Sequence, residues 1–164
     1  MSISGLFHTT QLGSVEVTQQ GILTFPKGIP SFEHCQNWHL FHEEKKDPVV
    51  FWLQSLDDPD VMLNVIDPAM LDVGYHLALT ETERYDLQLQ PDHILVALLI
   101  LSRTGSESRI QAQTHAPIII NLNTQRAIQK MNAQCHILSN QAVQAVTDVK
   151  PDTTSLKNND LRLI

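Results

Sequence analysis

The chain contains little cysteine, little glycine and no long hydrophobic run. Its two cysteines, Cys35 and Cys135, form no C-x-x-C pair in 164 residues, so we expect both to be reduced. The six glycines are spread singly, and neither a G-x-G-x-x-G nor a G-x-x-x-x-G-K phosphate loop occurs. The longest apolar run, residues 94–101, has eight residues, far short of the roughly 20 that a membrane-spanning helix needs. These absences argue against a nucleotide-binding protein and against a membrane-spanning one.

Basic and aromatic residues are also scarce. The chain has 11 Lys and Arg against 18 Asp and Glu, a net charge of −7, and only 5% aromatic residues. Residues 57–92 hold one basic and nine acidic residues, a sum of −8, so this segment accounts for the acidity. Such a segment repels phosphate backbones, and we therefore expect no direct binding to nucleic acid. It would attract a basic protein partner.

The length and the 42% hydrophobic content suit one domain with one core. We expect this domain to span residues 1–138. Residues 139–164 are mostly polar, and we expect them to form a partly disordered tail. The first residues lack both a basic leader and the apolar stretch of a secretory signal, so we expect a cytoplasmic protein.

The order of apolar, polar and turn-forming residues predicts mainly short β-strands separated by turns. Alternating apolar and polar residues at 15–18 and 22–25 predict a β-hairpin. Further strands are predicted at 38–41, 49–53, 61–66, 94–101, 110–113 and 118–120. Thr80 with Glu83 three residues later is typical of a capping box, which predicts a short helix near 81–87. The fold class is therefore all-β, mainly antiparallel, as a sandwich or small barrel with one or two short helices.

Eight histidines raise the question of a metal site, and the densest group of possible ligands is His34, Cys35, His39, His42 and Glu43. In an extended strand His39 and His42 point to opposite faces, and their spacing matches no standard zinc pattern. We therefore expect no metal and no cofactor. A small metal-dependent enzyme that uses His34, His39 and His42 remains the alternative.

No catalytic motif is apparent either. No G-x-S-x-G nucleophile elbow occurs, and the paired acids Asp57 and Asp58 lie in a D-D-P turn, whose hydrogen bonding explains them without acid catalysis. A β domain with an acidic segment and no reaction centre is typical of a protein that binds another protein rather than of an enzyme. A peptide-binding β module is a further alternative.

Three stretches taken together resemble the bacterial flagellar assembly factor family, FliW. They are GILTFPKGIPSFE at 21–33, FWLQSLDDP at 51–59 and APIIIN at 116–121. The family pattern contains F-P-x-G-I-P-G-F-E, an L-Q-S segment and A-P-I-V-I-N in this order, and the likeness spans residues 12–132. Ser31 stands where the family usually has glycine, and Thr114 and His115 stand where an Asn-Leu-type stretch is common.

The resemblance implies a small antiparallel β-barrel-like domain without enzymatic activity that acts as a cytoplasmic partner switch. Members of the family bind newly made flagellin. When flagellin is exported, the freed factor binds the RNA-binding translational regulator CsrA and lifts its repression of flagellin synthesis. The partner in excess holds the factor by mass action.

The resemblance also implies candidate residues. Partner binding is expected at Phe32, Gln54, Asp57, Asp58, Asp67 and Asn121, and structural roles within the motifs at Gly28, Pro30 and Pro117. Asp57 and Asp58 are the strongest candidates because a turn on an ordered scaffold exposes them. We expect reversal of both charges to lysine to weaken binding to the basic regulator and to leave thermal stability nearly unchanged.

Overall fold

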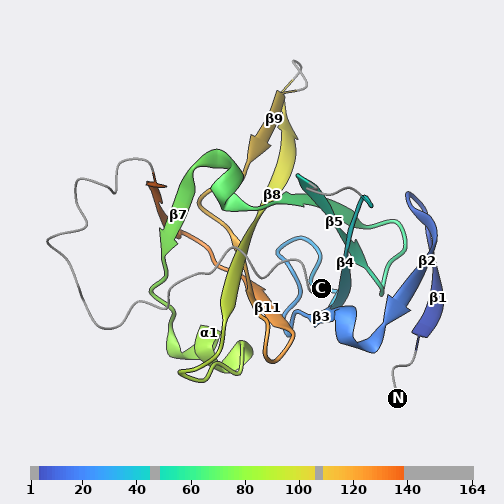
Figure 1. The fold of residues 1–164 in the computed structure, drawn as a ribbon, viewed down its shortest axis with the longest axis horizontal. Coiled ribbons are helices and arrows are strands. Elements are labelled where there is room, and N and C mark those ends of the chain that lie inside the picture. Colours follow the sequence, from blue (N-terminus) through green and yellow to red (C-terminus); the bar gives the residue numbers. More distant parts are fainter. Residues whose placement is uncertain (1–3, 45–48, 106–108, 139–164) are drawn as a thin grey trace, which may run out of the picture.

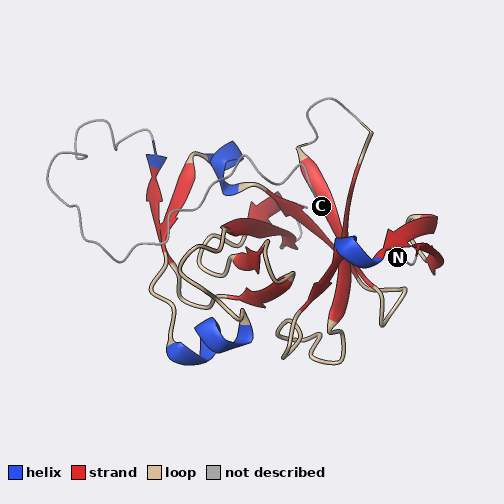
Figure 2. Cartoon of the chain, turned by 60° about the horizontal axis from the view of Figure 1, so that its bottom comes forward, coloured by secondary structure: helices blue, strands red, loops and turns tan. Residues whose placement is uncertain are grey.

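The structure is a computed structural model that describes residues 4–44, 49–105 and 109–138. The elements in chain order are β1 (Ser4–Thr9), β2 (Gly13–Thr18), η1 (Gln19–Gly21), β3 (Ile22–Thr24), β4 (Asn37–His42), β5 (Val50–Ser55), β6 (Met62–Ile66), η2 (Pro68–Leu71), β7 (Val73–His76), α1 (Glu81–Asp86), β8 (Leu95–Thr104), β9 (Arg109–Ala112), β10 (Ile118–Asn121), β11 (Arg126–Gln129) and β12 (Gln134–Ile137). Figure 2 shows mostly strands, with the helices as short segments at the periphery. Among the described residues, no helix is long and apolar enough to cross a membrane.

Seven strands close into a barrel. Their order is β10-β11-β3-β4-β5-β6-β8, and β8 pairs again with β10 (Figure 1). The β11–β3 pairing is parallel and the other six are antiparallel. β9 pairs with the far half of β8, so these two strands extend beyond the barrel as a hairpin. The predicted all-β, mainly antiparallel, barrel-like fold is confirmed.

The continuous apolar run at 94–101 is explained by burial on both faces of β8. Val96, Leu98 and Ile100 belong to the core inside the barrel, with Trp38, Phe25 and Leu53 among the residues around them. Leu95, Ala97 and Leu99 point the other way, into a second core outside the barrel. Because neither face meets water, the strand shows no alternation of apolar and polar residues.

The second core lies between the barrel wall and a cover made of β7, β12 and α1. Tyr75 of β7 and Leu87 at the end of α1 are buried in it. The predicted capping box forms: the Thr80 side chain accepts a bond from the backbone N–H of Glu83, and the Glu83 carboxylate accepts one from the backbone N–H of Thr80. The predicted helix is therefore confirmed. The pairing of β7 with β12 was not anticipated.

The hairpin predicted from residues 15–18 and 22–25 is wrong. β2 pairs with β1, whereas β3 pairs with β4 and β11. The turn lies earlier in the chain, where the Thr9 hydroxyl bonds the Gly13 carbonyl and the Leu12 N–H, and Gly13 adopts a φ of 70°. The 3-10 helix η1 then separates β2 from β3, so the β1–β2 hairpin stands beside the barrel (Figure 1).

The other predicted strands are found within a few residues of their expected ends. Cys35 and Cys135 are both free thiols, and Cys35 is buried in the barrel core. The tail predicted at 139–164 lies outside the described residues, so the domain boundary stays a prediction.

Candidate functional site

Residues 25–36, which we call the motif loop, connect β3 to β4. Four backbone hydrogen bonds fold it into successive turns. Phe25 donates to Gln36 at 2.7 Å, Gly28 to Phe25 at 3.0 Å, Phe32 to Ile29 at 2.7 Å and Cys35 to Phe32 at 2.9 Å. Ile29 and Cys35 are buried and Phe32 packs partly against the same core, so the loop is anchored to the barrel interior. It therefore presents a fixed surface.

Two left-handed residues shape the motif loop. Gly28 has a φ of 67°, and a Cβ at this position would lie 2.6 Å from the Cα of Glu33. Only glycine fits there, which supports a structural role. Ser31 has a φ of 75°, a conformation that costs a non-glycine residue free energy. Glycine would adopt this conformation without that cost.

Residues 56–60, which we call the acidic turn, lie beside the motif loop. The Oδ2 atom of Asp57 accepts the backbone N–H groups of Gln36 and Asn37, each at 2.7 Å, and Oδ1 accepts the side-chain amide of Asn37 at 3.2 Å. Partial burial alone would raise the pKa of Asp57, but these bonds outweigh it and hold the pKa below its ordinary value of 3.8. Asp57 therefore ties the turn to the end of the loop.

Asp58 and Gln54 also organise the acidic turn. The Asp58 Oδ1 accepts the backbone N–H of Asp60 at 3.0 Å, and its Oδ2 lies 3.3 Å from the Nε2 of His34. Gln54 is fully buried, and its amide donates to the carbonyls of Ser55 and Val61 at 2.9 and 3.1 Å. Gln54 thus shapes the turn from beneath, where no partner can reach it in this conformation.

The other end of the motif loop meets α1. The Lys27 ammonium lies 2.7 Å from the Asp86 carboxylate. Between them the loop, α1 and β11 enclose a pocket of about 290 Å³, with Glu33 and Glu83 in its lining. Lys130 lies 3.0 Å from Glu83. Acidic side chains therefore flank the motif loop on both sides, and the two lysines at the α1 end are paired with carboxylates.

Of the remaining candidates, Asn121, Asp67 and Pro117 lie outside the motif loop and the acidic turn. Asn121 is fully buried and donates to the Leu87 carbonyl at 3.0 Å. Asp67 caps η2 by accepting the N–H of Ala69 at 2.8 Å, and burial raises its pKa. Pro117 is buried, and its carbonyl accepts the N–H of Lys130. These contacts hold segments of the fold together. Pro30 is exposed in the motif loop.

The three histidines of the metal-enzyme alternative, His34, His39 and His42, do not lie close enough together to bind one ion. His39 is buried behind Gly21 and stacks on Phe41, and His42 lies against Phe51 at the far end of β4. Burial lowers the pKa of His39, which keeps the ring neutral near pH 7. Within the described ranges, the one group of three possible ligands combines His34 with Cys35 and Asp58 instead.

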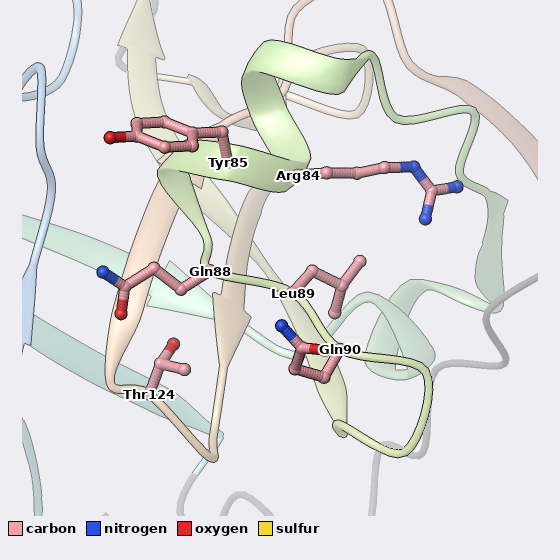
Figure 3. Close-up of a pocket in the computed structure, with 6 residues that line it drawn as sticks. All are labelled: Arg84, Tyr85, Gln88, Leu89, Gln90 and Thr124. Carbon is pink, nitrogen blue, oxygen red and sulfur yellow. The ribbon is translucent and has the colours of Figure 1, made fainter.

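A second, wider pocket of about 570 Å³ lies at the C-terminal end of α1 (Figure 3). Figure 3 shows Tyr85 and Gln88 on one side of it, with Arg84 extending away on the other; its lining is completed by Leu89, Gln90 and Thr124. Tyr85 is 79% exposed. No carboxylate, imidazole or thiol is part of this lining in the described part of the chain, so acid–base chemistry has no support here.

The sequence pattern did not predict that α1 packs beside the motif loop and pairs Asp86 with Lys27. The capping box signalled the helix, but nothing in the local pattern placed Asp86 beside Lys27 or Lys130 beside Glu83. These pairs join residues far apart in the chain, so only the closed barrel brings them together.

Comparison with known proteins points to one family. The family model described as FliW protein matches residues 6–143. A protein of Chromobacterium violaceum named "Flagellar assembly factor FliW" is 37% identical over 141 residues, covering 80% of this chain and 96% of its own. One of the same name from Azoarcus sp. (strain BH72) is 39% identical over 124 residues, covering 73% of this chain and 85% of its own. A crystal structure titled as the flagellar assembly factor FliW superposes with a TM-score of 0.66 at 24% identity, covering 82% of this chain and 96% of that chain, and this likeness supports the fold.

Proposed function

The chain belongs to the FliW family of flagellar assembly factors, and we propose that it acts as a non-enzymatic partner switch in the cytoplasm. In this proposal it holds newly made flagellin. Export of flagellin releases it, and it then binds and antagonises a CsrA-type RNA-binding regulator. The two partners compete by mass action, so flagellin synthesis follows export.

The observation that carries this proposal is the acidic surface around the motif loop. Asp57, Asp58 and Asp60 lie at one end of the loop, and Glu33 is exposed within it. Glu83 and Asp86, at the other end, are largely buried. Lys27 and Lys130 neutralise part of the charge at the α1 end, whereas among the described residues no lysine or arginine pairs with the acidic turn. An acidic surface on a rigid scaffold suits a basic protein partner, because complementary charge raises the association rate and fixes orientation.

Co-purification tests the proposal directly. The tagged full-length chain, expressed in its native cells, should retain flagellin when export is blocked. It should retain the regulator when flagellin is depleted. Loss of one partner as the other rises, at constant amount of tagged chain, is the signature of competition.

Two results would contradict the proposal. One is simultaneous retention of both partners at a constant ratio, whatever the flagellin level, because competition would then be absent. The other is recovery of the chain without either partner from cells that make both.

A further inference from the structure

Three metal-binding side chains meet where the motif loop touches the acidic turn. The Nε2 of His34, the thiol of Cys35 and a carboxylate oxygen of Asp58 all lie within 4.8 Å of one another. From this cluster we propose that the protein binds one divalent transition-metal ion of the zinc class, with His34, Cys35 and Asp58 as its protein ligands.

The distances suit a tetrahedral ion. Nitrogen and oxygen ligands at about 2.0–2.1 Å from zinc, separated by the tetrahedral angle, lie about 3.4 Å apart. His34 Nε2 and Asp58 Oδ2 are 3.3 Å apart. A thiolate at about 2.3 Å from the same ion would lie about 3.6 Å from each of them. The three ligand atoms lie within 4.8 Å of one another, so each distance to the sulfur needs to shorten by about 1.2 Å at most.

The ligands are held in place by contacts that need no metal. Asp57 fastens the acidic turn to the backbone of Gln36, one residue after Cys35. The Cys35 carbonyl accepts the Trp38 indole N–H at 3.0 Å. The second oxygen of Asp58 accepts the Asp60 N–H, which leaves Oδ2 for an ion. Such supporting bonds orient metal ligands and raise affinity.

The donor set selects the class of metal. One thiolate, one imidazole and one carboxylate suit zinc, cobalt and related ions, whereas magnesium and calcium prefer oxygen ligands alone. Cys35 is fully buried at the inner side, while the side chain of His34 is 63% exposed. A fourth ligand, water or a group from a partner, would therefore approach from the solvent side.

Binding moves one proton. Metal binding replaces the S–H bond of Cys35 with a metal–sulfur bond, and the thiol proton passes to solvent. His34 binds through a ring nitrogen and Asp58 through a carboxylate oxygen.

The test uses the reduced full-length protein with cobalt(II) and zinc(II) as probes. Cobalt should bind with one-to-one stoichiometry and show a thiolate charge-transfer band in the near ultraviolet. Calorimetry of zinc binding should report one ion bound per chain. Absence of the cobalt band would overturn the proposal.

Variants identify the ligands. His34→Gln and Asp58→Asn should each weaken zinc binding by more than the 10- to 100-fold that loss of a supporting residue costs. Cys35→Ser should abolish the cobalt band. Because Cys35 is fully buried and belongs to the core, His34→Gln is the decisive variant. The His34 side chain is largely exposed, and circular dichroism checks that the fold is kept.

Two control variants match these changes. His42→Gln removes another exposed histidine, and Cys135→Ser removes the other cysteine; both should bind zinc and cobalt as the unchanged protein does. The neighbouring rings of His76 and His136 form a possible second metal-binding pair, but a cobalt complex there would lack a Cys35-dependent band. Unchanged affinity in His34→Gln, or a band lost in Cys135→Ser alone, would overturn the assignment.

Discussion

The carboxylate of Asp57 accepts the backbone N–H of Gln36 at 2.7 Å, across the boundary between the acidic turn and the motif loop. The next backbone N–H, that of Asn37, binds the same oxygen at the same distance. From the sequence, reversal of Asp57 and Asp58 to lysine is expected to leave thermal stability nearly unchanged. The bonds of the Asp57 side chain to the motif loop instead predict a loss of stability when this residue is replaced.

Replacement of Asp57 by alanine should therefore destabilise the protein. Two backbone donors and one amide would lose their acceptor, and a loss of about 1–2 kcal/mol in the free energy of unfolding is expected for such partly exposed bonds. Urea denaturation measures it. The matched control is Asp92→Ala, which removes an exposed acid outside the acidic turn, and its midpoint should not move. Equal midpoints for the two variants would refute the linking role.

The Asp57 contribution should also depend on pH in the acid range. Its folded pKa lies below the unfolded value of 3.8, so the stabilisation is present above 3.8 and is lost as the pH falls through the folded pKa. The difference in unfolding free energy between wild type and Asp57→Ala should accordingly shrink in strong acid. A difference that stays constant from neutral pH downward would show that the charge of Asp57 contributes nothing.

Gly21 and His39 should be coupled in stability. A Cβ on Gly21 would overlap the buried His39 ring, so Gly21→Ala should cost about 1–3 kcal/mol. His39→Ala in the same chain removes the obstacle, and the double variant should be more stable than the sum of the single losses predicts. Gly5→Ala is the control, because nothing lies within 4 Å of its Cβ. Additive losses in a thermodynamic cycle would rule out the clash.

Stability should decrease below neutral pH because of His39. Burial lowers its folded pKa below 6.5, so the unfolded chain binds more protons between the two values and stability is lost as the pH falls through 6.5. His39→Phe keeps an aromatic ring and removes this titration. Unfolding free energies measured from pH 7 to pH 5 should show a smaller slope in the variant. Part of the slope should persist, because burial, and secondarily the charge of His76, also lower the pKa of His136.

Much of the fold was readable from local sequence, for physical reasons that particular residues make clear. The apolar run in β8 and the stiff isoleucines of β10 predicted strands because residues 95–100 and all of β10 are buried. Thr80 and Glu83 predicted the helix because a capping box is a local interaction. The hairpin prediction was wrong because alternation of apolar and polar residues identifies a strand but not the strand that it pairs with. β2 and β3 both alternate, and the turn at Thr9 pairs β2 with β1.

The candidate site was less predictable from the sequence, because residue type alone does not distinguish a side chain that binds a partner from one that stabilises the fold. Gln54 and Asn121 lie in family motifs, yet both are fully buried and hold loops from within. His34 and Asp58 are 24 residues apart in the chain, and only the pairing of β4 with β5 brings their loops together. The sequence pattern grouped His34 with His39 and His42 because these residues are close together in the chain. Closeness in the chain does not show which side chains are close in space.

Ser31→Gly should stabilise the protein. Ser31 has a φ of 75°, where a Cβ costs about 1–2 kcal/mol, although the greater freedom of glycine in the unfolded chain offsets part of the gain. A net increase of about 0.5–1 kcal/mol in unfolding free energy is expected. Ser31→Ala is the matched control: it removes the hydroxyl, keeps the Cβ and should bring no gain. A gain of equal size in both variants would assign the effect to the hydroxyl instead.

Charge reversal should separate partner binding from stability when it spares Asp57. Glu33 is exposed in the motif loop and Asp60 in the acidic turn, and their replacement by lysine should lower the association rate with the purified basic regulator by about tenfold or more at low salt. Each carboxylate accepts one hydrogen bond, from the Ser31 backbone N–H and the Thr10 hydroxyl, so circular dichroism first checks that the double variant is folded. Glu16→Lys with Asp92→Lys changes the net charge equally at exposed positions outside the motif loop and the acidic turn, so this pair should bind much as wild type does. Stopped-flow kinetics at several salt concentrations measures both. Equal slowing in the two double variants would mean that the overall charge, and not this surface, steers the partner.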